Sequence, residues 1–180
     1  MKLAGSKVFL RFFEEKDAEA LYNFHLRNKE FLQEYSPTRN NDFYTLRSKY
    51  KYIDDCIRQR ECDERYAFGI FMNDTNELIG NINLNEVLRG PSQSCLIGYS
   101  VDEQHNSKGY MTEAVLLAVQ FAFDHLRLHR IEAGVMPRNI ASMRVLEKVG
   151  FQKEGISQKN IKINGRWEDH QIFAIISDKE

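Results

Sequence analysis

Cysteine is scarce in this chain, and its distribution argues against the two architectures that cysteine most often builds. The 180 residues contain three cysteines, Cys56, Cys62 and Cys95, which is an odd number, and no C-x-x-C motif occurs. No histidine lies at ligand spacing from a cysteine pair. A disulfide framework or a structural zinc site is therefore not expected, and a reducing cytoplasm suits the chain. We expect no metal at its functional site.

Long apolar runs and an excess of one charge are also missing. No apolar run approaches the roughly 20 residues of a membrane span, and residues 1–7 lack the apolar core of a signal peptide. The net charge is −1, so no global field draws the protein to nucleic acid or to an anionic membrane. We expect neither partner. The length suits a single domain spanning residues 1–180.

The apolar periodicity predicts an α+β fold. Strands are predicted at residues 8–13, 66–72, 78–88, 94–101, 130–136, 151–163 and 166–176, and helices from Asp17 toward Leu32 and at residues 43–60, 112–126 and 139–149. Asp17 is the predicted N-cap of the first helix, Gly150 the C-terminal cap of the last, and Asn164-Gly165 a hairpin turn. Strand meanders and crossover helices alternate in this order. It implies a mixed sheet of about seven strands, flanked by about four helices.

The most informative segment is Asn106-Ser107-Lys108-Gly109-Tyr110-Met111, between a predicted strand and a predicted helix. A short turn that opens a helix directs free backbone N–H groups toward one point, and the positive helix end adds to this effect. Such a site favours phosphate or pyrophosphate, and Gly109 lets the backbone approach closely. The alternative is an ordinary turn that caps a helix.

These residues resemble the GNAT acyltransferase superfamily, whose phosphate motif is Gln/Arg-x-x-Gly-x-Gly/Ala. Gly109 matches the first required glycine, whereas Asn106 and Met111 stand at positions where the family has other residues. Residues 136–142 and 145–151 resemble the Asn-x-x-Ser block and Gly-Phe ending of one GNAT branch. Further segments are similar to the ribosomal-protein-alanine N-acetyltransferases of that branch, namely residues 88–90, 97–100, 129–131 and 164–170.

The resemblance implies a GNAT fold and transfer of the acetyl group of acetyl-CoA to an amine. The implied acceptor is the N-terminal α-amine, with alanine as the terminal residue, of a ribosomal protein. Two alternatives stay open. One is acetylation of a small amine such as a polyamine, an antibiotic or an amino acid. The other is a non-catalytic acetyl-CoA-binding module, which the departures at Asn106 and Met111 permit. A second copy of the chain is a further candidate partner.

In the family, two neighbouring strands splay apart at a bulge, and the pantetheine arm inserts between them. A glycine within a strand often marks a bulge or a close approach, so Gly98 is the candidate here, with simple packing as the alternative. The resemblance implies that a backbone N–H near Tyr99 polarises the thioester and that Val101 pairs with a pantetheine amide. The implied acetyl-CoA contacts are Tyr99, Val101, Asn106, Ser107, Lys108, Gly109, Tyr110, Met111, Asn139 and Ser142, with Met111 expected to pack mainly into the core.

Glu103 and Ser142 are predicted to carry the proton transfers. Tyr99 and Tyr110 are alternative acids, although tyrosines at such positions more often pack. The resemblance places Asn139 on the pantetheine or acetyl group and Ser142 beside the sulfur, as the proton donor to the thiolate. The alternative is that Asn139 only caps its helix and Ser142 faces solvent. Glu103, at the end of a strand, is the candidate base, with Asp102 a weaker one. A glutamate's ordinary pKa of about 4.3 is low for a base, so this role requires partial burial. Otherwise Glu103 is a solvated strand end.

Overall fold

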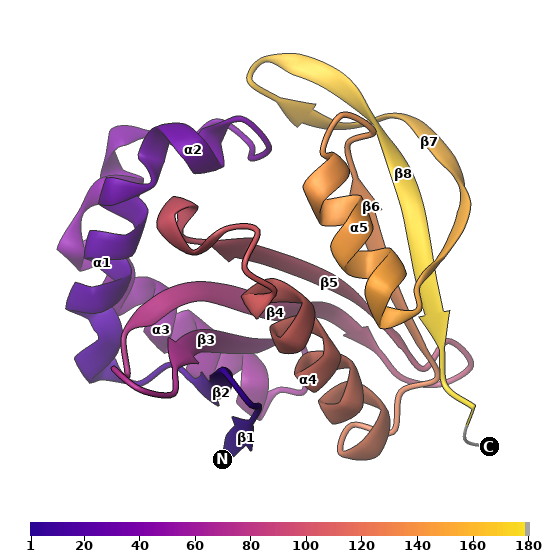
Figure 1. Ribbon diagram of the computed structural model, residues 1–180, viewed down its shortest axis with the longest axis horizontal. Helices are drawn as coiled ribbons and strands as arrows, with labels where there is room; N and C mark the ends of the chain where they lie inside the picture. Colours follow the sequence, from indigo (N-terminus) through magenta and orange to yellow (C-terminus); the bar gives the residue numbers. More distant parts are fainter. Residues whose placement is uncertain (179–180) are drawn as a thin grey trace.

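A computed structural model describes residues 1–178, and a mixed sheet of eight strands runs through them (Figure 1). The strands are β1 (Lys2–Ala4), β2 (Val8–Phe12), β3 (Tyr66–Met72), β4 (Leu78–Leu88), β5 (Ser94–Val101), β6 (Arg130–Val135), β7 (Gln152–Ile163) and β8 (Arg166–Ile176). Their order across the sheet is β1-β2-β3-β4-β5-β6-β8-β7. Neighbouring strands are antiparallel except β5 and β6, which are parallel.

Five α-helices and three short 3-10 helices accompany the sheet in the described part of the chain. They are α1 (Ala18–Arg27), α2 (Lys29–Gln33), α3 (Leu46–Glu61), α4 (Tyr110–Asp124) and α5 (Ile140–Val149), with η1 (Glu15–Asp17), η2 (Asn41–Tyr44) and η3 (Glu103–His105). Alternate residues of β2 reach opposite faces of the sheet: Val8 and Leu10 join one core cluster and Phe9 joins the other. The first cluster includes α4 and α5, and the second includes α1 and α3.

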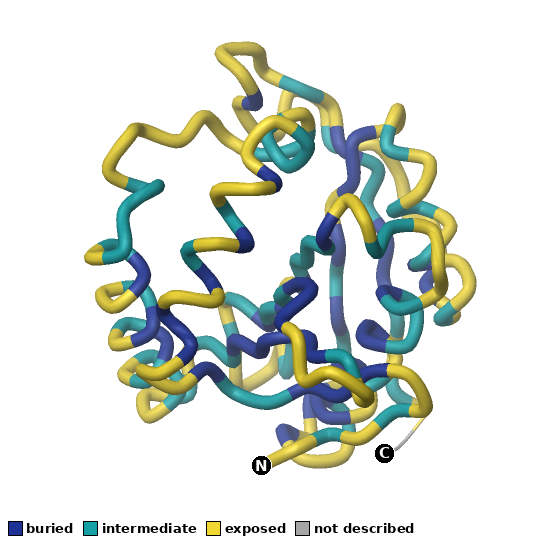
Figure 2. The backbone as a smooth tube through the Cα atoms, turned by 60° about the vertical axis from the view of Figure 1, so that its left-hand side comes forward, coloured by how far each residue is buried: buried dark blue, intermediate teal, exposed yellow. Residues whose placement is uncertain are grey.

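Burial on both faces holds the sheet between its helices. Phe68 and Phe173 are fully buried on the α4 side, and Phe24 is fully buried on the α1 side. A side chain of this size contributes about 1.5–3 kcal/mol when it is fully buried. In Figure 2 the buried segments run through the interior and the exposed segments face outward. No helix within residues 1–178 is long and apolar enough to cross a membrane.

The predicted α+β fold is confirmed, with one more strand and one more helix than expected. The extra strand is β1, whose three residues are too short and too exposed to leave an apolar pattern. The extra helix arises because the predicted first helix is interrupted at Asn28, whose side chain donates to the carbonyl of Phe24 at 2.9 Å. The second predicted helix begins at Leu46, after the 3-10 turn η2, and the side chain of Thr45 caps it.

Asp17 occupies the predicted N-cap position of α1, but its side chain does not cap that helix. The carboxylate instead accepts two hydrogen bonds from Arg11, at 2.6 and 2.7 Å, and one from the amide of Glu14 at 2.8 Å. Burial alone would raise the pKa of Asp17, but these hydrogen bonds outweigh it and the pKa lies below its usual range. Asp17 therefore links β2 to the start of α1.

The pairing between β5 and β6 is short, and this positions the site. Only Ser94, Cys95 and Leu96 of β5 are in register with β6. Beyond Leu96 the two strands diverge, and their facing edges border a cleft. The irregularity in the neighbouring β4 lies between Asn85 and Leu88, where Glu86 has a φ of +51°. Gly98 itself pairs regularly with Asn83, so the expectation of a bulge at Gly98 was wrong.

Candidate active site

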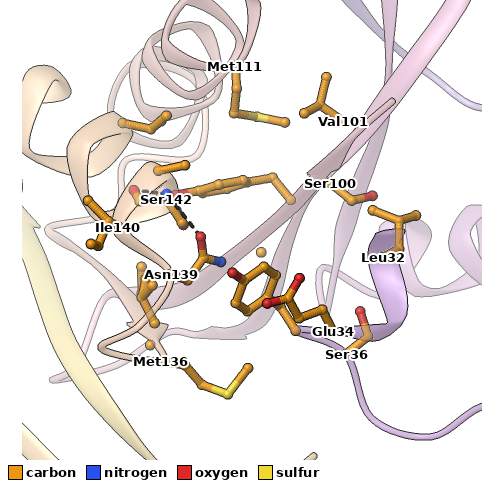
Figure 3. A pocket seen from close by; sticks show the side chains of 18 of the residues that line it. Leu32, Glu34, Ser36, Ser100, Val101, Met111, Met136, Asn139, Ile140 and Ser142 are labelled. Atoms are coloured by element: carbon orange, nitrogen blue, oxygen red, sulfur yellow. Dashed lines mark hydrogen bonds between the residues drawn. The ribbon is translucent and has the colours of Figure 1, made fainter. Parts of the chain in front are cut away.

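A cleft of about 520 Å³ opens where β5 and β6 diverge (Figure 3). The last five residues of β5 form one wall, and residues 133–136 at the end of β6 form the other. The start of α5 and Met111 of α4 close the cleft on one face of the sheet. The end of α2, the loop after it and His170 of β8 border it on the other.

The two faces of the cleft differ in chemistry because residues along a strand alternate in direction. Tyr99 and Val101 of β5 point to the side of α4 and α5, where they pack against the main core. Gly98 and Ser100 lie on the opposite face, toward α2. Figure 3 accordingly shows Ser100 near Leu32 and Ser36, with Asn139 and Ser142 on the other side of the cavity. We call these two parts the α5 side and the α2 side of the cleft.

Hydrogen bonds on the α5 side connect Tyr99, Asn139 and Ser142. The hydroxyl of Tyr99 lies 2.8 Å from Ser142 Oγ and 3.3 Å from the carbonyl oxygen of Ser142. The Oδ1 of Asn139 accepts from the amide of Ser142 at 3.2 Å. Asn139 therefore caps α5 and also lines the cleft, while Ser142 is half-buried rather than turned to solvent. Burial raises the pKa of Tyr99 to about 12, so its hydroxyl keeps its proton at neutral pH.

The turn at residues 106–111 lies at the entrance to the cleft and opens α4. Gly109 is the N-cap residue with a φ of +84°, and no side chain caps the helix there. The amide of Ser107, whose φ is +60°, donates to Asn106 Oδ1 at 3.0 Å. Asn106 and Met111 border the cleft, and Met111 is also part of the core, as expected. The uncapped first turn leaves backbone donors available to an anion.

The other residues of this turn differ in exposure. Ser107 and Lys108 are exposed beside Gly109, so the ammonium of Lys108 is open to solvent. Tyr110 is half-buried and packs against the ring of His105, with 5.9 Å between the ring centroids. Tyr110 therefore supports the turn by packing, and its backbone belongs to the first turn of α4.

A segment near the N-terminus is attached to this turn, which the sequence did not indicate. Glu113 of α4 accepts hydrogen bonds from the amides of Ser6, Lys7 and Val8, at 2.6, 3.0 and 3.0 Å. The ammonium of Lys7 lies 3.6 Å from the point where a Cβ on Gly109 would stand. A second lysine besides Lys108 is thereby placed next to the turn. The hydrogen bonds join residues more than 100 positions apart, so no local pattern predicts them.

The candidate bases from the sequence, Glu103 and Asp102, lie outside the cleft lining. Glu103 belongs to η3 and is exposed, so the partial burial that its role requires is absent. Asp102 is buried and binds Arg27 at 2.5 Å and the amide of Gln104 at 3.0 Å. Burial alone would raise the pKa of Asp102, but the hydrogen bonds from Arg27 and Gln104 keep it below its usual range. Asp102 is therefore part of an ion pair.

The α2 side contains polar groups that the sequence analysis did not assign. Glu34, Tyr35 and Ser36 border the cleft directly after α2, and Glu34 points toward the cavity in Figure 3. Gln33 and Asn164 exchange two hydrogen bonds, of 2.9 and 3.1 Å, so the end of α2 touches the turn between β7 and β8. This contact fixes the end of α2 directly before Glu34, which borders the cleft. No helix or strand period could reveal it, because the two residues are 131 positions apart.

This geometry agrees with the comparison to known families. Residues 7–152 match the model of the family described as the Acetyltransferase (GNAT) domain. The chain belongs to the GNAT acetyltransferase family. It is therefore an acetyl-CoA-dependent acetyltransferase, and the fold and activity that the sequence resemblance implied are confirmed.

Relatives of this acetyltransferase match over nearly its whole length. A probable N-acetyltransferase of Bacillus subtilis, YjcK, is 50% identical, with 97% of each chain covered. The ribosomal protein uS5-alanine N-acetyltransferase of Escherichia coli is 30% identical, covering 97% of this chain and 90% of the relative. The structure of Mycobacterium smegmatis RimJ in complex with CoA-disulfide superposes with a TM-score of 0.91 at 27% identity, covering 96% of this chain and 83% of RimJ.

Proposed function

We propose that the cleft binds acetyl-CoA between β5 and β6 and that the enzyme acetylates the N-terminal α-amine of a protein, with an alanine terminus of a ribosomal protein as the first candidate. The observation that carries this proposal is the divergence of β5 and β6 beside the Tyr99–Ser142 pair. Past Leu96 each strand presents a backbone edge to the cleft. Pantetheine carries amides that suit such edges, and RimJ and the uS5-alanine acetyltransferase support the choice of ligand and acceptor.

Different residues along the cleft bind the pyrophosphate, polarise the thioester and protonate the thiolate. The turn at residues 106–111 holds the pyrophosphate through the backbone donors of α4, and Lys108 adds positive charge. The backbone of Tyr99 polarises the thioester carbonyl, and Val101 pairs with a pantetheine amide. Asn139 orients the arm from the N-terminus of α5, while Ser142 gives a proton to the leaving thiolate. The Tyr99 hydroxyl lies 2.8 Å from Ser142 Oγ and fixes the orientation of Ser142. With its pKa raised to about 12 by burial, this phenol keeps its own proton at neutral pH.

The acceptor approaches from the α2 side, opposite to the Ser142 hydroxyl. An α-amine with a pKa near 8 is roughly a tenth neutral at pH 7, whereas a lysine amine near 10.4 is far less so. An α-amine therefore depends less on a general base for its deprotonation than a lysine side-chain amine does. The carboxylate of Glu34 and the hydroxyl of Ser36 border this approach. A cationic amine is attracted there before it is deprotonated.

A small amine is the second candidate acceptor, and one contact favours it. The hydrogen bonds between Gln33 and Asn164 join α2 to the β7–β8 turn beside the cleft residue Glu34. We infer that this contact narrows the approach on the α2 side. A polyamine or amino acid passes a narrow opening more easily than a folded protein does. An N-terminal segment must be extended to do the same.

A peptide panel with acetyl-CoA tests the proposal by following the release of CoA thiol. The panel contains peptides that differ only in the N-terminal residue (alanine, serine and others), a peptide blocked at its α-amine but carrying free lysine, and a set of small amines. Selective turnover of the alanine peptide is the expected result. Turnover restricted to small amines would establish the second candidate. Binding of acetyl-CoA without turnover of any amine would contradict both.

A further inference from the structure

His170 of β8 is a buried histidine on the α2 side of the cleft to which the sequence analysis gave no role. Only 4% of its surface is exposed, yet it borders the cavity. It lies on the same face of the sheet as Gly134 of β6, where a Cβ would stand 3.7 Å from the Cβ of His170. Gly134 has no side chain, so the imidazole is not covered from that strand. His170 therefore faces the part of the cleft through which an acceptor would enter.

The hydrogen bonding of His170 determines which ring nitrogen carries the proton. Its Nδ1 lies 3.1 Å from the backbone carbonyl oxygen of Glu168. A carbonyl oxygen only accepts hydrogen bonds, so Nδ1 donates, and in the neutral ring the lone pair is on Nε2. Nε2 makes no hydrogen bond with any residue of the described chain. An imidazole that is held through Nδ1 and presents an unbonded Nε2 to a cleft has the arrangement of a general base.

Three charged side chains bear on the part of the cleft that His170 borders. Arg138, which precedes α5, forms an ion pair with Glu168 at 3.2 Å, so these two charges compensate each other. Glu34, from the loop after α2, has no ion-pair partner within residues 1–178, and it interacts with the hydroxyl of Tyr35. Opposite His170 on β7 stands Ser157, which does not titrate. The lining that the cleft shares with His170 therefore includes a carboxylate without an ion-pair partner among the described residues, which suits an ammonium.

We propose that His170 is the general base that deprotonates the acceptor amine, an inference that rests on the proposed function. Nε2 takes a proton from the acceptor ammonium and becomes an imidazolium. The neutral amine attacks the thioester carbonyl carbon, so a C–N bond forms and the C–S bond breaks. The sulfur leaves as a thiolate and takes up the second proton of the amine nitrogen, passed on by Ser142. The products are the acetylated amine and CoA thiol, and His170 returns its proton to water.

This assignment replaces Glu103 in the role of base. Glu103 is exposed on η3 and does not border the cleft, whereas His170 is buried and does. Histidine is also the side chain that most often serves as a general base, because its ordinary pKa of about 6.5 lies near neutral pH. The sequence showed His170 only as the last residue of the 164–170 segment. Its place in the cleft depends on the register between β8 and β6.

The test is the variant His170→Asn, measured with an amine that the peptide panel shows to be turned over. Asparagine can keep the donor to the Glu168 carbonyl while it removes Nε2. We expect kcat to fall by about 100-fold, with the KM for acetyl-CoA and the melting temperature unchanged. Without the base the variant can use only amine that is already neutral, so its loss of turnover relative to wild type should shrink as the pH rises toward the amine pKa of about 8. A purely structural role would not produce this. His170→Gln, which keeps the size of the side chain, serves as the second variant.

The matched control is His129→Asn, because His129 is exposed at the opposite end of β6 and should tolerate the change. A kcat of His170→Asn within twofold of wild type would overturn the inference. So would a loss of turnover in Glu103→Gln alone, since that result would return the base to Glu103. In both cases the proposed function would stand, because the wild-type enzyme still turns over the amine. If the wild-type enzyme turned over no amine of the panel, both the proposed function and this inference would be excluded.

Discussion

The hydroxyl of Tyr99 lies 2.8 Å from Oγ of Ser142, and this contact joins β5 to α5 on the α5 side of the cleft. If Ser142 passes a proton to the leaving thiolate, then Ser142→Ala should lower kcat by about 100-fold. Tyr99→Phe should lower it less, because it removes only the group that orients Ser142. The double variant should be no slower than Ser142→Ala. Steady-state kinetics of the three variants check this, and additive losses would contradict a shared role.

Gly109 should be required for tight binding of acetyl-CoA. Its φ of +84° lies in the left-handed region, where an L-residue costs about 1–2 kcal/mol. Gly109→Ala should therefore distort the turn at residues 106–111 and raise the KM for acetyl-CoA about tenfold, while kcat at saturation changes little. The matched control is Gly90→Ala: its φ is +66°, and it lies in the β4–β5 loop, outside the lining of the cleft. An equal rise in KM in both variants would show that strain alone is responsible.

Glu34 should contribute to the binding of the acceptor but not of acetyl-CoA. Its carboxylate borders the α2 side and has no ion-pair partner among the described residues. Glu34→Gln keeps the shape and removes the charge, so the KM for a cationic acceptor should rise about threefold, as expected for a partly solvated ion pair. The exposed Glu30 of α2 provides the control, as Glu30→Gln. An unchanged acceptor KM in Glu34→Gln would exclude this role.

Asp102 should matter for stability in a pH-dependent way. Its pKa is lowered in the folded protein, so the stabilisation is fully present above the ordinary carboxyl pKa of about 4 and is lost as the pH falls through the lowered value. Asp102→Asn should reduce the free energy of unfolding at pH 7 by about 1–3 kcal/mol. The difference in the free energy of unfolding between wild type and variant should shrink below about pH 4.

Denaturant unfolding at pH 7 and at pH 3 measures this difference, with Asp54→Asn as the control. Asp54 is exposed on α3, so Asp54→Asn should have the same free energy of unfolding as wild type at either pH. A difference of constant size for Asp102→Asn would mean that its carboxylate makes no favourable charge interaction in the folded state.

Local chemistry explains which parts of the fold the sequence predicted. Asn164 and Gly165 both adopt positive φ, of 49° and 79°, as a two-residue hairpin turn requires. Gly150 ends α5 with a φ of 110°, for the same reason of backbone freedom. By contrast, Glu86 carries the bulge in β4, although no side-chain preference marks a glutamate for positive φ. The predicted bulge therefore fell on Gly98, the residue type that usually marks one.

The residues of the cleft also fall into those that local sequence patterns predicted and those that only long-range contacts bring together. The turn at 106–111 and the cap of α5 by Asn139 were predictable, because each depends on residues within one or two turns. His170 and Glu34 border one cleft only because β8 pairs with β6 and α2 touches the β7–β8 turn. Those contacts join residues far apart in the chain. The turn at 106–111 and the α5 side of the cleft were thus accessible from local sequence patterns, and the α2 side was not.

The short register between β5 and β6 has a consequence for the protein in the cell. Three residue pairs join the strands, and the edges beyond them have no strand partner within residues 1–178. A molecule that fills this gap with amides of its own completes the sheet, so it binds the native chain and not the unfolded one. Such binding raises the free energy of unfolding in proportion to the logarithm of the ligand's concentration. The lifetime of this enzyme would then follow the supply of acetyl-CoA, and a starved cell would hold a more fragile protein.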